Sequence, residues 1–480
     1  MSYDTTHPDY DKQSRLWRFM ADSLDGQEIK RKRTIYLPKT NGQLEVEATI
    51  NRDTRRVEES GFALSDVEKL YDSYLNRAKY PMWVKDQLRT MMGLVSNLPF
   101  NMDVPDVLKG LEDNATSDGL TLRQLFQRAV SGLLTHGRYV LTPDIDENGN
   151  LFIRHYVAEQ FINWKVQNVK GRQDITVAVF SELKDASNDS FDHDFDLIYR
   201  AFVLDEHGCH QYVYQNGAVI EDRYLGFENK PIQYAPIVVL GSTQNSTNID
   251  ELPLLTVAEC ALTYYQKSAD VNQAMHDGCS FQTVVFGLEQ DQDIGFTGGG
   301  TIWTLPSKEK CDVKIVEPTF ANLKVAIDEM NKQKEMASEA GAKVIDIGVE
   351  SGEARIARQR DQYATLRSII LNVAEAIQQV FRYGYDLVMY NNDTAQHKNI
   401  LFTIEAEFSE AGIDVNLLNS LKEMATMNKL SWDSVWSYVQ DGAVPKRAYA
   451  QEQELIESEQ VNAPLAGYQP NGVSNGSGQS

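Results

Sequence analysis

The chain has 480 residues, of which 42% are hydrophobic and 24% charged, the mix of a globular protein that can bury a sizeable core. At about 150 residues per domain, this length predicts about three structural units. Acidic residues outnumber basic ones by 69 to 46, which gives a net charge of −23 and a pI near 4.8. Extensive tight binding of nucleic acid needs a basic face that displaces counterions, so this balance excludes it and leaves only local or weak contact with DNA.

The cysteines and the apolar segments predict a reducing compartment and no membrane. Cys209, Cys260, Cys279 and Cys311 are too sparse for a disulfide framework. The N-terminus has neither the basic start nor the apolar stretch of a signal peptide. No uninterrupted apolar run approaches the ~18 residues of a membrane span. We therefore expect a soluble, unexported protein without a lipid anchor.

The first third of the chain predicts helices. A short helix is expected near residues 10–24, and the basic run 30–33 leads into a short strand at 34–37 that Pro38 stops. That run is either a solvated face or a DNA contact. Ser65 and Glu68 form a capping box, and a second helix follows Pro81 over 84–95. The clearest helix covers 122–136, because Thr121 and Gln124 cap its start and Gly137 suits its left-handed end.

A β-rich block follows, and after it the apolar residues again recur at the spacing of a helix. Asn216 and Gly217 predict a tight hairpin turn, since both residues tolerate positive φ. Expected strands are at 139–141, 151–156, 175–182, 197–204, 212–214, 218–223, 237–240, 283–286, 301–305 and 400–407. Expected helices are at 254–277, 321–341, 353–391, 415–427 and 432–439, with one more after Pro445. Residues 461–480 carry no charge and predict a disordered tail. The fold class is therefore α+β with unusually long helices.

Several motifs suggest metal or catalytic chemistry without completing it. Residues 144–149 match the first half of an EF-hand loop, but His155 stands where the bidentate glutamate belongs, so a hairpin turn fits better. The acidic run over 185–196 is either a metal-chelating loop or an exposed one; its members are Asp185, Asp189, Asp192, Asp194 and Asp196. His207, Cys209 and His210 lack a second zinc-ligand pair. No P-loop occurs, and the Gly-x-Ser-x-Gly match at 472–476 lies in the predicted tail. The residues therefore predict no enzyme, no metal and no cofactor.

Six segments in the same order resemble a family of tailed-bacteriophage portal proteins, long catalogued as a domain of unknown function. The strongest block is 252–270, and the others are 74–99, 135–141, 156–164, 335–342 and 351–354. The pattern departs from the family at Ser351 and Gly352, where Glu-Thr is expected. The resemblance implies a head–tail connector: a ring of about twelve subunits at one capsid vertex. Double-stranded DNA enters through its channel, driven by the terminase, and later leaves through it.

The resemblance also implies a division of the chain into a portal fold, with an α/β wing, a two-helix stem, a small α/β clip, a long tunnel and wing helix and a short helical crown. The wing takes 1–250, the stem helices 251–277 and 319–345, the clip 278–318, the tunnel loop 346–352, the long helix and return strand 353–408, the crown 409–455 and the disordered tail 456–480. Expected partners are further copies of the chain, the terminase large subunit, a head–tail adaptor, the major capsid protein, the scaffold and the DNA. The expected location is the virion, after assembly in the host cytoplasm.

The implied site residues fall into three groups. Asp346, Gly348, Glu350 and Gly352 belong to the tunnel loop. Lys343, Arg355, Arg358 and Arg360 either face the DNA or form helix-surface and intersubunit ion pairs. Glu289, Asp291 and Asp293 lie in the clip, where terminase or adaptor would dock. Two alternatives stay open: a metal-dependent phosphodiesterase or nuclease that uses the acidic loop, and a head–tail adaptor ring.

Overall fold

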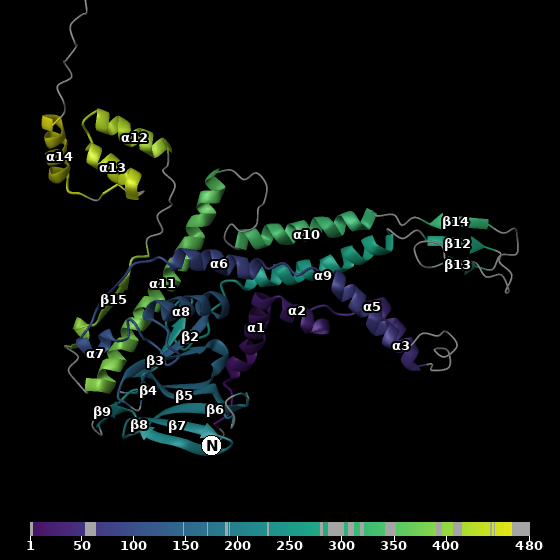
Figure 1. The fold of residues 1–480 in the computed structure, drawn as a ribbon, viewed down its shortest axis with the longest axis horizontal. Helices are drawn as coiled ribbons and strands as arrows, with labels where there is room; N and C mark the ends of the chain where they lie inside the picture. The colour runs from purple at the N-terminus through teal and green to yellow at the C-terminus, as the bar shows by residue number, and fades with distance from the viewer. Residues whose placement is uncertain are drawn as a thin grey trace, which may run out of the picture. The chain divides into compact units, whose positions relative to one another are not determined.

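The computed structural model describes most of the chain as two compact units, 1–406 and 407–480. The described residues are 3–52, 64–146, 148–169, 171–187, 191, 193–227, 230–278, 282–286, 302–305, 312–316, 321–340, 352–389, 396–406, 415–441, 444–445 and 447–462. Helices and mostly antiparallel sheets share the first unit, and the second unit is helical (Figure 1). The predicted α+β class is confirmed.

The N-terminal part of the first unit is helical. Its elements are α1 (Pro8–Asp25), α2 (Gln27–Arg31), η1 (Arg33–Ile35), α3 (Asn41–Arg52), α5 (Leu64–Arg77) and α6 (Trp83–Val95). The predicted strand at 34–37 is wrong. The amides of Ile35, Tyr36 and Leu37 bond to carbonyls three or four residues earlier, so the segment turns as a 3-10 helix. Tyr36 and Leu37 are buried instead of paired in a sheet.

Helix α8 (Leu122–His136) forms as the sequence predicts. Thr121 and Gln124 complete the capping box, and Gly137 ends the helix in the left-handed conformation at φ 66°. The apolar stripe of α8 is buried, including Leu125, Ala129 and Leu133 at 0% exposure. A Cβ on Gly137 would lie 2.7 Å from the carbonyl oxygen of Glu251, so this position requires glycine for both its φ and its close approach.

Two antiparallel sheets form the β-rich block. The first has the order β11-β2-β3, and the second has the order β4-β5-β6-β7-β8. Their strands are β2 (Arg138–Ile145), β3 (Leu151–Val157), β4 (Phe161–Val169), β5 (Arg172–Asp185), β6 (Phe195–Leu204), β7 (Cys209–Gln215), β8 (Ala218–Tyr224) and β11 (Val238–Gly241). Asn216, at φ 51°, and Gly217 make the predicted hairpin turn. Shorter elements complete the unit: η2 (Ala158–Gln160), β9 (Gly226–Phe227), β10 (Lys230–Pro231), α7 (Asp106–Lys109) and β1 (Phe100–Asp103).

The main core joins both sheets to the long helix α11 (Gly352–Met389). Val140 of β2, Phe180 of β5, Phe202 of β6 and Leu387 of α11 belong to one buried cluster. Figure 1 shows α11 running beside the two sheets and α8. After η3 (Gln396–Asn399), strand β15 (Leu401–Ile404) returns to pair with β1 in an antiparallel ladder. The chain thus closes this unit with residues that are about 300 positions apart, a contact of very high sequence separation.

A helix, a small sheet and a second helix come between β11 and α11 in the chain. The helices are α9 (Leu255–Gly278) and α10 (Ala321–Ala340), and Figure 1 shows them side by side. The sheet has the order β13-β12-β14, with strands β12 (Gln282–Phe286), β13 (Ile302–Leu305) and β14 (Asp312–Val316). Strand β12 pairs parallel with β13 and antiparallel with β14. The predicted strand at 283–286 is confirmed, and the one at 301–305 is confirmed over the described residues 302–305.

The second unit contains α12 (Val415–Thr426), α13 (Trp432–Asp441) and α14 (Tyr449–Asn462). All three helices are predicted from the sequence, the last as the helix after Pro445. Helix α14 continues past residue 456, so the predicted tail begins too early. Glu452, in the first turn of α14, accepts hydrogen bonds from Ser431 and Ser434 and so fixes the start of α14 to the start of α13.

Candidate functional site

Polar contacts fix helix α9 to the N-terminal helices. Tyr74 Oη donates a hydrogen bond to Asp270 Oδ1 at 2.6 Å, and Arg77 Nη1 donates to Gln273 Oε1 at 3.0 Å. Asn272 Nδ2 donates to the carbonyl of Arg77 at 2.9 Å. Burial and the hydrogen bond to Asp270 raise the pKa of Tyr74 well above its usual value, so its hydroxyl remains a donor at neutral pH. Helix α9 is therefore held in one orientation by its own subunit.

Helix α10 packs on α9 and leaves apolar side chains at the surface. Among the side chains described on α10, only Ala337 and Ser338 are buried. Val325 is 69% exposed and Met336 is 41% exposed. These two lie on the same side of the helix, because three turns span about 11 residues. Asp328, Glu329 and Lys332 lie between them along the same side, so this surface is mixed, with two separate apolar side chains among charged ones.

The small sheet stays close to one end of this helix pair for covalent reasons. Strand β12 begins at Gln282, soon after α9 ends at Gly278, and α10 begins at Ala321, soon after β14 ends at Val316. Each residue spans at most about 3.6 Å, so each connection is shorter than about 20 Å. The sheet therefore adjoins the C-terminal end of α9 and the N-terminal end of α10.

Helix α11 is firmly packed over the part where its side chains are described. Ile369, Ile370, Val373, Ile377 and Phe381 are each 0% exposed. At 1.5 Å per residue, the whole helix is about 57 Å long. Helices of this length are unusual for one compact subunit, and here the three-stranded sheet, β15 and α8 pack against it.

The predicted tunnel and clip residues lie mostly outside the described part of the chain. That holds for Asp346, Gly348, Glu350 and Lys343, and for the clip residues Glu289, Asp291 and Asp293. Gly352 is the first residue of α11. Arg355, Arg358 and Arg360 belong to the first turns of that helix, but their side chains are outside the described part. Of these residues, only Gly352 and the three arginines are placed, and only by their backbones.

The basic run before the N-terminal 3-10 turn is paired within the protein. Lys32 Nζ lies 2.6 Å from Asp22 Oδ2, and Arg33 Nη1 lies 2.7 Å from Asp72 Oδ1. Arg31 pairs with Glu28 one turn earlier in α2. Arg31, Lys32 and Arg33 are therefore paired with carboxylates of the protein's own helices, which favours a structural role for the run over a DNA contact.

The motif at 144–149 is a hairpin turn between β2 and β3. Asp146 accepts hydrogen bonds from the amides of Asn148 and Asn150, as a turn aspartate does. Asp144 lies inside the protein, where it pairs with Arg154 Nε and Arg223 Nη2, each at 2.6 Å. Burial alone would raise the pKa of Asp144, but the two guanidinium groups outweigh it and hold the pKa below its usual value. The ionised carboxylate of Asp144 therefore forms ion pairs with two arginines.

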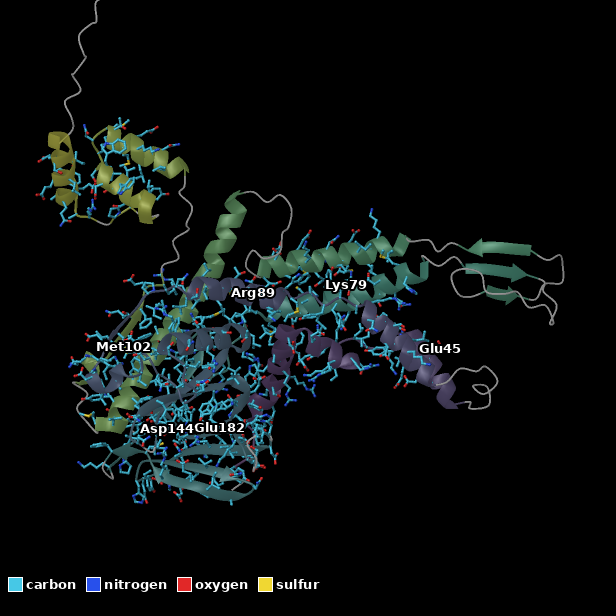
Figure 2. The ribbon with its side chains drawn as sticks, in the orientation of Figure 1. Glu45, Lys79, Arg89, Met102, Asp144 and Glu182 are labelled. Carbon is cyan, nitrogen blue, oxygen red and sulfur yellow. The ribbon has the colours of Figure 1, made fainter. Side chains whose placement is uncertain are left out.

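A second buried ion pair lies close to Asp144. Arg200 Nε donates to Glu182 Oε1 at 2.8 Å, and Tyr156 Oη donates to the same oxygen at 2.6 Å. Burial opposes the ionised form of Glu182, yet the bonds from Arg200 and Tyr156 lower its pKa overall. Figure 2 shows Asp144 and Glu182 in the region of the two sheets. Because Arg223 comes from β8 and Asp144 from β2, these pairs join the five-stranded sheet to the three-stranded one.

Asp189 and Asp192 of the acidic run lie outside the described residues, and Asp185, Asp196 and Cys209 have separate surroundings. Asp185 accepts from Ser187 at the end of β5, and Asp196 accepts from Gln215 and Asn216 across the sheet. Cys209 is buried, which raises the pKa of its thiol to about 12. Among the described residues, no group of three histidine, cysteine or acidic side chains is arranged to hold a metal ion. No helix in that part of the chain is long and apolar enough to cross a membrane.

Comparison with known proteins gives one family and several distant structures. The family described as a domain of unknown function (DUF4055) matches residues 253–386, which include α9, the small sheet and α10. No curated protein sequence matches the chain. A chain from the virion of a native gene transfer agent particle covers 80% of this chain and 92% of its own length, with 10% identity and a TM-score of 0.39.

Two further structures are similar at the same level. A chain from the neck of an empty gene transfer agent particle covers 76% of this chain and 87% of its own, with 10% identity and a TM-score of 0.38. An HK97-family phage portal protein from Corynebacterium diphtheriae covers 68% of this chain and 92% of its own, with 13% identity and a TM-score of 0.31. TM-scores below 0.5 at such identities carry no functional assignment, so function rests on the chain itself.

Proposed function

We propose that this chain is the subunit of a phage portal ring, the head–tail connector at one capsid vertex. Double-stranded DNA would be packaged through its channel by the terminase and later ejected through it. The observation that carries the proposal is the succession of α9, the small sheet, α10 and α11 in the residues whose motifs resemble portal proteins. Two adjacent helices with a small sheet between them in the chain correspond to a stem and a clip, and α11 corresponds to the long helix that follows.

The exposed side of α10 supports assembly of several copies. A closed ring needs a heterologous contact, in which one face of each subunit meets a different face of the next. Val325 and Met336 offer one such face on α10, and the polar contacts of α9 with α5 hold the helix pair in place. We propose a ring of about twelve subunits in which this side of α10 contacts the neighbouring copy.

The charge of the chain suits a conduit for DNA. A surplus of carboxylates repels phosphates, so it prevents the tight binding that would stall a moving duplex. We propose that Asp346, Gly348, Glu350 and Gly352 line the channel. In the same proposal, Lys343, Arg355, Arg358 and Arg360 face the DNA or pair with the neighbouring subunit.

The proposed partners follow from this role. The clip, with Glu289, Asp291 and Asp293, would dock the terminase large subunit during packaging and the head–tail adaptor afterwards. The major capsid protein and scaffold would surround the ring, which would assemble in the host cytoplasm and remain in the virion. We propose no catalytic role. A metal-dependent phosphodiesterase would need convergent acidic ligands, and Asp185 and Asp196 bond to separate partners.

The test is to image the purified full-length protein by negative-stain microscopy and to weigh it by mass photometry. We expect rings with a central hole and about twelve subunits, although rings of eleven or thirteen would also fit. Monomers or dimers at every salt and protein concentration would refute the proposal.

A pair of variants then tests the surface itself. Val325→Asp combined with Met336→Asp places two carboxylates in every subunit contact, so we expect at least a tenfold loss of rings. The matched control is Leu183→Asp, which changes a leucine that is 71% exposed on β5. Rings that form equally well from both variants would show that this side of α10 is not the contact.

A further inference from the structure

A cavity of about 750 Å³ lies between three parts of the chain in the first unit. Its walls are the start of α1 with the residue before it, the middle of strand β4, and the segment 247–251 that leads towards α9. Sites for small molecules typically have volumes of roughly 300–1,000 Å³ and a few polar groups that converge on the ligand. The cavity therefore has the size of a small-ligand site.

A buried arginine behind the cavity wall has donors without acceptors. Arg138 is 0% exposed, and its Nη2 donates to the carbonyl of Thr247, a wall residue, at 3.2 Å. Among the described residues, no atom accepts a hydrogen bond from its Nε or Nη1. Burial lowers the pKa of Arg138 to about 9, because the attraction of Asp250 and Asp9 offsets only part of the desolvation. Buried donors without an acceptor are rare in native proteins, so this guanidinium favours a further negative group nearby.

Two stacked rings connect Arg138 to the cavity. Its guanidinium carbon lies 3.9 Å from the ring centroid of Trp164, and the ring of His7 stacks on Trp164 at the same centroid distance. Both rings line the cavity. Burial, with the charge of Arg138, lowers the pKa of His7, so this imidazole is neutral at pH 7.5. Its Nδ1 accepts from the amide of Asp9 at 3.1 Å, so the proton is on Nε2, which can donate to a ligand.

Three carboxylates and two lysines also line the cavity, and most of them already have partners. Asp9 pairs with Lys12 at 2.8 Å, and Asp250 Oδ2 accepts from two backbone amides of its own loop. Lys165 is exposed and pairs with no carboxylate of the described residues. Glu251 is exposed as well, and its charge repels a polyanion such as DNA. The groups that remain free are thus mostly donors, which suits a small anion.

We propose that this cavity binds a small oxyanion of the phosphate class. Lys165 Nζ and His7 Nε2 donate to the oxyanion, and the charge of Arg138 behind the cavity wall attracts it. A carboxylate is held best by the free fork of an arginine, and that of Arg138 is buried with Nη2 already bonded, whereas a lysine serves a phosphate as a point charge. The bound anion links the start of α1 to β4. This site goes beyond the proposed function and does not depend on it.

The experiment measures binding of ³²P-labelled inorganic phosphate to the full-length protein by equilibrium dialysis at pH 7.5, with sodium chloride keeping the ionic strength constant. We expect saturable binding of one phosphate per chain, with a dissociation constant on the order of 0.1 mM. Lys165→Gln removes the lysine charge, and His7→Phe removes the Nε2 donor while keeping a ring on Trp164. Each should weaken binding about tenfold. The matched control, Lys184→Gln, removes an exposed lysine near the end of β5 and should bind as wild type does.

Thermal unfolding of each variant without phosphate shows whether it folds as wild type does. Because Lys165 is exposed, Lys165→Gln should keep the fold, and it decides the outcome if His7→Phe is unstable. Phosphate should also raise the melting temperature of wild type more than chloride at equal ionic strength, since a ligand of the folded state stabilises it. Binding that does not saturate, or that Lys165→Gln leaves unchanged, overturns the proposal. An equal loss with Lys184→Gln also overturns it, because the attraction would then be non-specific.

Discussion

Replacing Asp144 with asparagine should destabilise the protein through the two arginines that it leaves behind. The carboxylate is 3% exposed and lies 2.6 Å from both Arg154 Nε and Arg223 Nη2. Asparagine keeps the volume and one accepting oxygen, so the change removes the negative charge and little packing. The two guanidinium groups then remain at the junction of the two sheets without their shared counterion.

The size of the effect follows from burial. Removing one partner of a fully buried ion pair costs about 3–5 kcal/mol. Arg154 is 25% exposed and Arg223 is 37% exposed, and Arg223 also contacts Glu221 at 2.9 Å. Water and Glu221 therefore compensate in part, and we expect a loss of about 2–3 kcal/mol in the free energy of unfolding. At about 2 °C per kcal/mol for a large unit, the melting temperature should fall by about 4–6 °C.

The assay is thermal unfolding of wild type, Asp144→Asn and the control Asp146→Asn between pH 8 and pH 3. Asp146 is partly exposed in the same hairpin, and an asparagine oxygen can accept the two amide hydrogen bonds that its Oδ1 accepts, so its variant should melt within about 1 °C of wild type at pH 7. The folded-state pKa of Asp144 lies below its ordinary value of 3.8. Its ionic contribution is thus complete above that value and is lost as the pH falls through the lowered folded-state pKa.

The two curves should therefore converge at low pH. Wild type loses the contribution of Asp144 on acidification, whereas the asparagine variant never had it. A melting temperature of Asp144→Asn equal to that of Asp146→Asn at pH 7 would refute the reasoning. A difference that stays constant down to pH 3 would show that the loss comes from packing and not from charge.

Three further outcomes are expected. The purified ring should cleave neither DNA nor nucleotides with Mg²⁺, Mn²⁺ or Ca²⁺, and turnover that disappears with Asp192→Ala plus Asp194→Ala would contradict this. Gly348→Pro should leave ring assembly intact and lower DNA packaging or retention, because proline restricts the backbone of the proposed tunnel loop; unchanged packaging would mean that the loop is only a connector. Gly137→Ala should cost about 2–4 kcal/mol in urea unfolding, since it adds left-handed strain and a backbone clash, whereas Gly42→Ala on α3, with open space around it, should be neutral or stabilising.

Helices and strands whose apolar residues recur at regular spacing were predictable from the sequence, and those in which that spacing is interrupted were not. Helix α8 has both caps and a full apolar stripe, so its bounds follow from local chemistry. Strand β4 lacks a clean alternation because its pairing with β5 shifts register at two places, so the period-two signal is lost. The start of helix α3, in contrast, is marked in the sequence by a capping motif. Thr40 Oγ1 accepts from the amide of Gln43 and Gln43 Oε1 accepts from the amide of Thr40, which is a capping box in the sequence.

The buried ion pairs escaped prediction because they form across distant strands. Asp144 stands out in the sequence only as part of a calcium-like motif, since its partners Arg154 and Arg223 come from different hairpins. Arg200 offers a usable signal. It is two residues from both Ile198 and Phe202, so all three side chains lie on the same, buried side of β6. An arginine at such a position requires a buried acidic partner. Which acid pairs with it depends on the register of β5 and β6, which local pattern does not determine.

The two helices of the proposed stem differ in a way that bears on assembly. Polar side chains of helix α9 form hydrogen bonds within its own subunit, as the bond from Tyr74 to Asp270 shows. Helix α10 instead exposes Val325 and Met336 on its outer side, among charged side chains. Identical subunits close into a ring only if each carries one rigid reference face and a different face that reaches the next copy. For that reason we expect Val325→Asp to act on assembly while leaving the contacts of α9 with α5 unchanged.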